Sequence, residues 1–224
     1  MIQIKNLCKD YNRNGKNFHA LNNVNLDIIS GDFINIIGRS GSGKSTLLNI
    51  CAGMMTPTSG QIFFNGQDIS HCNDNELSLI RNKKIGFIPQ NASALENLSI
   101  LENILLPACI YSSDNNDSED HARSLLEKFN ISGLADSFPD ELSGGELRRA
   151  LIARALINHP EIIIADEPVS DLDINSAYEV MKIFADLNSE GVTLLMVSHD
   201  LDTLKYGNKI YTMSGGNLLS GNKL

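Results

Sequence analysis

The sequence has no hydrophobic run long enough to cross a membrane. Its apolar runs, such as residues 33–37, are far shorter than the roughly 20 residues that a membrane-spanning helix needs. Residues 1–5 also lack the long apolar core that defines a signal peptide. We therefore expect a cytosolic chain that reaches a membrane only through another protein.

Cysteines are few, and they are not arranged in pairs. None of the four forms a C-x-x-C pair or joins a Cys/His cluster with zinc spacing, which excludes the common zinc motifs. Reduced thiols in a cytosolic protein are the simplest interpretation. The four residues are Cys8, Cys51, Cys72 and Cys109.

Basic residues are also in the minority. The 224 residues include 18 Lys and Arg against 27 Asp and Glu, a net charge of −9. Such a chain is repelled by nucleic acid and by anionic lipid headgroups, so we expect no nucleic-acid partner through bulk charge. The hydrophobic content of 42% is ordinary for a globular protein and is sufficient for a sizeable core.

The hydrophobic pattern predicts strands first, helices in the middle, and an alternation of both at the end. Strands are expected at 24–28, 33–37 and 61–64, the last before the hairpin-type turn Asn65-Gly66. Helices are expected at 99–106 and 119–129, with the polar stretch 112–118 as an exposed loop between them. Helices at 143–158 and 176–187 alternate with strands at 162–165 and 192–197, which indicates a parallel α/β sheet.

A glycine-rich segment follows the strand at 33–37 and matches G-x-x-x-x-G-K-[ST]. In this context the backbone N–H groups and the positive end of the next helix, which opens with Thr46, surround phosphate oxygens. Lys44 is placed to reach the β- and γ-phosphates, and the Ser45 hydroxyl to hold Mg²⁺. The motif alone fits a kinase, a GTPase or a helicase equally well. Its residues are Gly38, Arg39, Ser40, Gly41, Ser42, Gly43, Lys44 and Ser45.

The strand at 162–165 ends in two carboxylates. Ligands of open α/β sheets lie at the carboxyl ends of strands, so Asp166 is placed to orient Mg²⁺, and Glu167 to activate a water as general base. The alternative is a solvated strand end followed by a turn at Pro168.

The segment Leu142-Ser143-Gly144-Gly145-Glu146 is the most specific motif. Ser143 and Glu146 form a capping box that begins a helix, and the two glycines let a phosphate approach the helix end. Together with the motifs above, this segment resembles the ABC-type ATPases over essentially the whole chain. The other matching pieces, all in family order, are Tyr11, Gln90 after Phe87-Ile88-Pro89, Ser170-Asp171-Leu172-Asp173, and His199.

The resemblance implies an α/β P-loop NTPase fold with a mixed core sheet and an N-terminal antiparallel β subdomain. It also implies that residues 1–224 form one nucleotide-binding domain, with a helical subdomain inserted at about 91–158. The cofactors it implies are ATP and Mg²⁺. Two chains, most simply identical, bind two ATP molecules head-to-tail. Residues 143–146 of one chain then complete the phosphate loop of the other, beneath a membrane permease encoded on another chain.

The resemblance also assigns the remaining side chains. Tyr11 stacks on adenine, and Gln90 contacts Mg²⁺ or the attacking water and senses the membrane partner. His199 contacts the γ-phosphate while steadying Glu167, and Asp173 crosses the dimer interface. The plainer alternatives are a surface tyrosine, a loop glutamine, and two residues that only begin helices.

Residues 40–49 and 98–107 resemble the lipoprotein-release and macrolide-export branch, which includes peptide-antibiotic export. The sequence departs from that branch at three places. Val169-Ser170-Asp171 stands where the branch commonly has Thr-Gly-Asn, Glu146-Leu147-Arg148 replaces a glutamine-rich stretch, and Pro89 precedes Gln90. The cargo therefore stays open. So does a signalling role like that of the cell-division ATPase, acting through a membrane partner without transport. A clamp that binds ATP without turnover is disfavoured, because Glu167 and His199 are both present.

Overall fold

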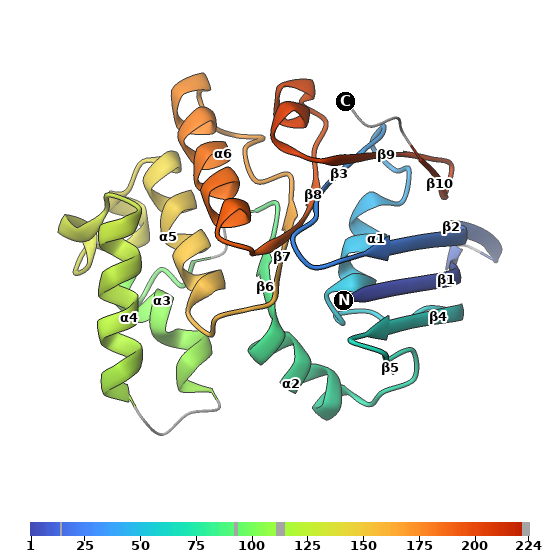
Figure 1. The fold of residues 1–224 in the computed structure, drawn as a ribbon, viewed down its shortest axis with the longest axis horizontal. Helices are drawn as coiled ribbons and strands as arrows, with labels where there is room; N and C mark the ends of the chain where they lie inside the picture. The colour runs from blue at the N-terminus through green and yellow to red at the C-terminus, as the bar shows by residue number, and fades with distance from the viewer. Residues whose placement is uncertain (14, 92–93, 111–114, 221–224) are drawn as a thin grey trace.

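Two sheets with a group of helices beside them make up the chain (Figure 1). The computed structural model describes residues 1–13, 15–91, 94–110 and 115–220. The smaller sheet has the strand order β2-β1-β4-β5 and the larger one the order β10-β9-β3-β8-β7-β6. The α/β class and the mixed sheet implied by the family resemblance are confirmed.

The smaller sheet is antiparallel throughout and comes from the N-terminal third of the chain. It contains β1 (Ile2–Arg13), β2 (Lys16–Ile28), β4 (Ser59–Phe64) and β5 (Gln67–Asp68). The hairpin turn predicted at Asn65-Gly66 joins β4 to β5, and both residues have positive φ, 48° and 83°. This is the backbone that an Asn-Gly hairpin turn requires.

In the larger sheet, five strands run parallel and one edge strand is antiparallel. The parallel strands are β3 (Phe33–Ile37), β6 (Ile85–Ile88), β7 (Ile162–Asp166), β8 (Thr193–Val197) and β9 (Lys209–Ser214). Strand β10 (Asn217–Ser220) pairs antiparallel with β9. The predicted parallel arrangement is therefore right for the strands at 162–165 and 192–197, and the strand predicted at 33–37 lies in the same sheet.

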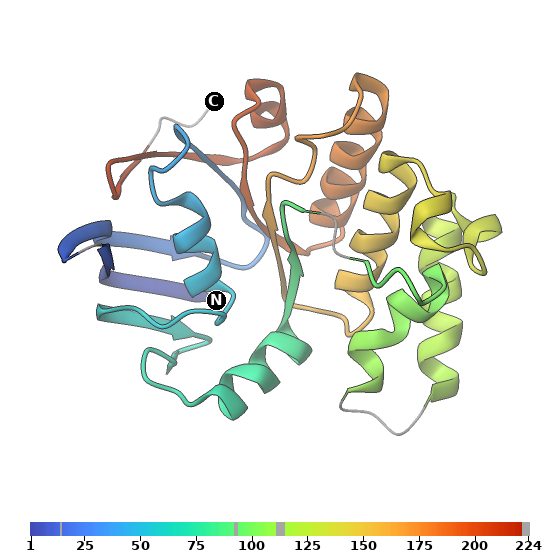
Figure 2. The same ribbon diagram turned by 180° about the vertical axis from the view of Figure 1, so that it is seen from behind.

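Helices cover both faces of the larger sheet (Figures 1 and 2). They are α1 (Lys44–Cys51), α2 (Asp74–Lys84), α3 (Ile100–Cys109), α4 (Asn115–Lys128), α5 (Gly144–Leu156) and α6 (Ile174–Ser189). Helices α3, α4 and α5 pack on one another, whereas α1 lies between the two sheets. None of the helices in the described residues is long and apolar enough to cross a membrane.

One predicted loop is in part a helix. Helix α4 begins at Asn115, so residues 115–118 are helical, whereas residues 112–114 of the predicted loop lie outside the described residues. Acidic side chains such as Asp117 in a first turn are stabilised by the helix dipole, and Arg123 pairs with Glu119 one turn away at 2.7 Å. Part of the polar composition that suggested a loop therefore belongs to the first turn of a helix.

The larger sheet separates two hydrophobic cores, and strand β7 shows how. Ile163 and Ala165 pack into the core under helices α3 to α6, whereas Ile162 and Ile164 pack into the core with α1 and the smaller sheet. A strand buried on both faces must be apolar at every position, which is why β7 is a continuous apolar run. The carboxyl end of β7 is thus held from both sides.

Candidate functional site

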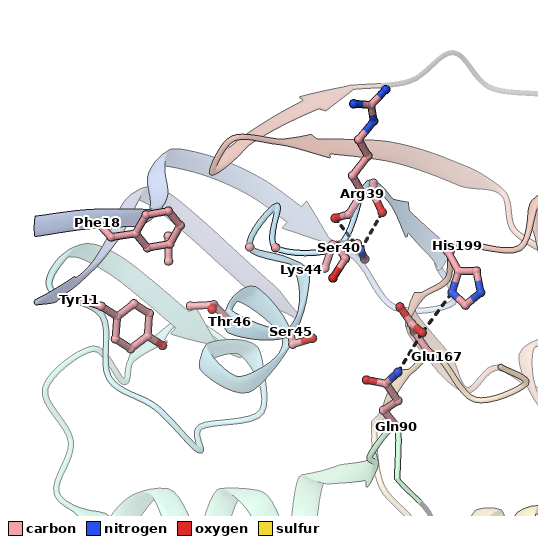
Figure 3. Close-up of a pocket in the computed structure, with 14 residues that line it drawn as sticks. Tyr11, Phe18, Arg39, Ser40, Lys44, Ser45, Thr46, Gln90, Glu167 and His199 are labelled. Atoms are coloured by element: carbon pink, nitrogen blue, oxygen red, sulfur yellow. Dashed lines mark hydrogen bonds and ion pairs between the residues drawn. The ribbon is translucent and has the colours of Figure 1, made fainter. Parts of the chain in front are cut away.

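A cavity of about 700 Å³ opens at the carboxyl ends of the central strands (Figure 3). It contains twelve of the residues expected from the sequence and two that were not, Phe18 and Ala20. Ser42 and Asp166 were also expected; both are buried and do not line the cavity. The lining residues are Tyr11, Phe18, Ala20, Gly38, Arg39, Ser40, Gly41, Gly43, Lys44, Ser45, Thr46, Gln90, Glu167 and His199.

The glycines of the loop after β3 are required by close contacts. A Cβ atom at Gly38 would lie 2.3 Å from the carbonyl oxygen of Met213, and one at Gly43 would lie 2.3 Å from that of Ala20. Gly43 also has a φ of 108° and caps α1 without a side chain. The first N–H groups of α1 are consequently not covered by a capping side chain, which suits the loop to an anion.

Lys44 places a positive charge inside this loop. Its side chain is buried, and its ammonium group donates hydrogen bonds to the carbonyl oxygens of Gly38 at 2.7 Å and Arg39 at 3.1 Å. Because both partners belong to the loop itself, the cation is held within the loop, at the base of the cavity.

Asp166, at the end of β7, has the features of a magnesium ligand. It is buried, and its Oδ1 atom has no hydrogen-bond partner among the described residues. Burial raises the pKa of this carboxyl, the Ser45 hydroxyl lowers it, the charge of Glu167 raises it, and Lys44 lowers it. A desolvated carboxylate beside a hydroxyl is the hard oxygen environment that Mg²⁺ prefers, so these two residues fit that ion.

We expect Asp166→Asn to stabilise the folded chain in the absence of Mg²⁺. The pKa of Asp166 is raised in the folded state, so ionisation costs stability above that pKa, and the cost vanishes below the unfolded value. The melting temperature of the variant in chelator should thus exceed that of the parent by a few degrees at neutral pH. The difference should shrink as the pH falls. A variant equal to the parent at neutral pH, or no different from exposed Asp136→Asn, would contradict this.

The ends of three neighbouring strands bring two side chains to one carboxylate oxygen of a third. The Gln90 amide, in the loop after β6, donates to Oε2 of Glu167 at 3.1 Å. Nδ1 of His199, in the loop after β8, lies 3.1 Å from the same oxygen and donates when it carries the proton. Figure 3 shows both contacts. Glu167 itself has a φ of 48°, a left-handed conformation that costs a non-glycine residue about 1–2 kcal/mol and occurs at functional sites.

The other end of the cavity is aromatic. Tyr11 and Phe18 are direct cross-strand partners in β1 and β2, and the Tyr11 hydroxyl lies 3.0 Å from the sulfur of Met55. Phe18 is 54% exposed, which leaves its ring open to a flat ligand. The sequence reasoning missed Phe18, although the dipeptide Asn14-Gly15 signals a hairpin that would place it opposite Tyr11.

The segment 143–146 lies outside this cavity. Its predicted capping box is confirmed: the Ser143 N–H donates to the Glu146 carboxylate at 2.9 Å, and the Glu146 N–H donates to Oγ of Ser143 at 3.3 Å. Asp173 similarly caps α6 through the N–H of Asn175 at 2.9 Å. Within the described part of the chain, none of these residues lines the cavity, so a single chain does not bring them to the phosphate loop.

Residues 21–170 match the model of the protein family described as ABC transporter. A Methanocaldococcus jannaschii protein, the uncharacterised ABC transporter ATP-binding protein MJ1508, is 41% identical over 219 residues, covering 98% of both chains. LolD of Buchnera aphidicola subsp. Schizaphis graminum, named as the ATP-binding protein of a lipoprotein-releasing system, is 39% identical over 98% of this chain and 96% of LolD.

MacB of Chlorobaculum tepidum, named as a macrolide export ATP-binding/permease protein, is 39% identical over 223 residues. The match covers all of this chain but only 34% of MacB, so the chain corresponds to about a third of that protein.

Solved structures show the same fold over the whole chain. The dimeric structure of MJ0796, described as a bacterial ABC transporter cassette, has a TM-score of 0.93 and 36% identity, covering 100% of this chain and 99% of its own. MJ0796 has also been solved as a dimer in a post-hydrolysis state bound to ADP and Pi, with a TM-score of 0.93 and 35% identity over the same shares.

Proposed function

The chain belongs to the ABC transporter family and is an ATPase of the kind that forms the ATP-binding subunits of that family. From this premise we propose how its residues bind and hydrolyse ATP. The loop from Gly38 to Ser45 holds the phosphates, with the Lys44 ammonium at its base. The rings of Tyr11 and Phe18 hold the adenine at the far end of the cavity, where base–aromatic stacking contributes ~1–3 kcal/mol.

The hydroxyl of Ser45 and the carboxylate of Asp166 hold Mg²⁺, and the Gln90 amide reaches the ion or the attacking water. The ion supplies charge stabilisation at the phosphates. The unpartnered Oδ1 of buried Asp166 supports this assignment, because a desolvated acceptor is stabilised by a cation.

Glu167 is the general base in this proposal. The observation that carries it is the convergence of Gln90 and His199 on Oε2 of Glu167. With Oε2 fixed by these two donors, Oε1 is the oxygen that accepts the proton of the attacking water. His199 also contacts the γ-phosphate. A carboxylate whose orientation is held by two neighbours is preorganised for proton transfer.

Two copies of the chain complete each other's sites. The capped start of α5, at Ser143 to Glu146, closes on the phosphates held by the loop of the other copy, and Asp173 crosses the same interface. Two observations support this: the α5 start lies outside the chain's own cavity, and the similar MJ0796 is solved as a dimer.

The test of this arrangement is Ser143→Arg. The substitution puts a bulky cation at the end of α5, outside the chain's own cavity. We expect the affinity of the isolated chain for ATP, measured by calorimetry, to stay within about twofold of the parent, because the phosphate loop is unchanged. Turnover at saturating ATP should fall by at least about a hundredfold, the scale on which a lost transition-state contact acts. Parental turnover in this variant would refute the shared site.

The chain drives a separate membrane permease, to which it binds at the inner face of the membrane. The names of LolD and MacB support a substrate of the lipoprotein or macrolide kind, and the name of MacB supports export as the direction. The loop of Gln90 joins the nucleotide site to the helices α3 to α5, so it is the segment we assign to sensing the permease.

We expect membrane attachment to depend on that permease. Expressed alone, the chain should stay in the soluble fraction and hydrolyse ATP slowly. Expressed with its permease, it should copurify with membranes and turn over faster, because the permease holds two copies together. Fractionation and an ATPase assay with and without the permease check this. Attachment to membranes in the absence of any other subunit would contradict it.

A further inference from the structure

A buried arginine on α5 connects that helix to the loop of Gln90. Arg148 is only 3% exposed, and it donates from Nη1 to the carbonyl oxygen of Pro89 at 3.1 Å and from Nη2 to that of Gln90 at 3.2 Å. The two acceptors are consecutive backbone groups. A planar guanidinium that binds both fixes the orientation of the peptide as well as its position.

The same part of α5 is held on its other side by the start of α6. A Cβ at Gly145 would lie 2.7 Å from Oγ of Ser176, and Arg149 forms an ion pair with Glu179. The first two turns of α5 are therefore attached to two segments at once, and Arg148 provides the attachment to the loop of Gln90.

Energetics indicate that Arg148 is not a packing residue alone. Burial disfavours its charged form, and the charge of Asp171 acts in the opposite direction. The two charge-assisted hydrogen bonds of Arg148 offset this desolvation without making the buried charge a source of stability. What such a group supplies is a defined geometry.

We infer that Arg148 is a positioning residue for hydrolysis, acting through Gln90. It holds the Gln90 peptide so that the side-chain amide meets Oε2 of Glu167 in the same chain. The position of the Gln90 amide, which donates to Glu167, thereby depends on the position of α5. This inference rests on the roles proposed above for Gln90 and Glu167.

The arrangement links the two nucleotide sites of the proposed dimer. The start of α5 closes on the phosphates held by the other copy, and Arg148 lies in the next turn of that helix. A displacement of α5 where it closes on the phosphates of the other copy is therefore passed to Glu167 of its own chain. The guanidinium of Arg148 and the Gln90 peptide transmit it.

The experiment is the kinetics of Arg148→Met, which keeps an unbranched apolar stem, shorter than that of arginine, and removes both donor groups. We expect kcat to fall by about ten- to a hundredfold, the effect of a small displacement of a catalytic group. The KM for ATP should change less than about twofold, because the phosphate loop and the aromatic rings are untouched. Arg148→Lys, which keeps the charge and can still donate to a carbonyl, should recover part of kcat. Exposed Arg123→Gln on α4 is the matched control and should match the parent.

A double-mutant cycle with Gln90→Ala separates positioning from a structural role. Once the Gln90 amide is absent, Arg148→Met should lower kcat by less than about a further twofold. Equal losses of kcat in both backgrounds, or an increase in KM with kcat unchanged, would overturn the inference. If Arg148→Met does not fold by its melting curve, Arg148→Lys is carried through the same cycle. Parental turnover in Gln90→Ala would instead refute the proposed role of Gln90.

Discussion

Glu167→Gln should lower ATP turnover by about two to four orders of magnitude, the usual contribution of a general base. The amide cannot accept the proton of the attacking water. The affinity for Mg-ATP should stay near that of the parent, because the phosphate loop and Asp166 are unchanged. Single-turnover hydrolysis and calorimetry measure the two quantities, and exposed Glu127→Gln on α4 is the matched control. Hydrolysis at the parental rate would show that Glu167 is not the base.

The same variant should also trap the dimer. The amide removes a negative charge near the γ-phosphate at the subunit interface, so repulsion falls and bound ATP persists. We expect a dimer on size exclusion with Mg-ATP and a monomer with ADP. Adding Ser143→Arg should abolish this dimer. If the single variant stays monomeric with ATP at low salt, the run is repeated with the permease. A monomer there too would refute the shared site.

Lys44→Ala should lower ATP affinity by at least about a hundredfold. Losing one or two charge-assisted hydrogen bonds to the phosphates costs roughly 3 kcal/mol, and each 1.4 kcal/mol is a factor of ten. Calorimetry with Mg-ATP measures this, and a melting curve shows whether the fold survives. Lys182→Ala, which removes an exposed lysine on α6, is the control. Unchanged affinity in Lys44→Ala would refute the assignment of the phosphate loop.

A mixture of two inactive chains gives an independent test of the head-to-tail arrangement. A Ser143→Arg chain keeps its phosphate loop, and a Lys44→Ala chain keeps its α5 start. In a mixed dimer, the phosphate loop of the Ser143→Arg chain meets the intact α5 start of the Lys44→Ala chain, which gives one complete site. The second site contains both substitutions. On the Glu167→Gln background, the mixture should therefore form a dimer that retains one ATP, whereas neither chain should dimerise alone.

Several parts of this protein follow from its sequence alone because they depend on neighbouring residues. The loop from Gly38 to Ser45 needs glycine where the backbone approaches other chain segments, and that need is visible as a motif. The capping box at Ser143 joins residues three apart, so it too was predicted correctly. The strand at 162–165 was recognised because a strand buried on both faces is apolar throughout.

The tertiary structure decided which distant residues meet. Gln90 and His199 meet at one carboxylate oxygen of Glu167 only because β6, β7 and β8 are neighbours in the sheet. No local sequence pattern contains this strand order. Arg148 looked like a departure from a glutamine-rich segment, but the packing of α5 brings it to the Gln90 carbonyl. Local conformation depends on nearby residues and is readable in sequence, whereas the site depends on strand order and helix packing, which only the folded chain specifies.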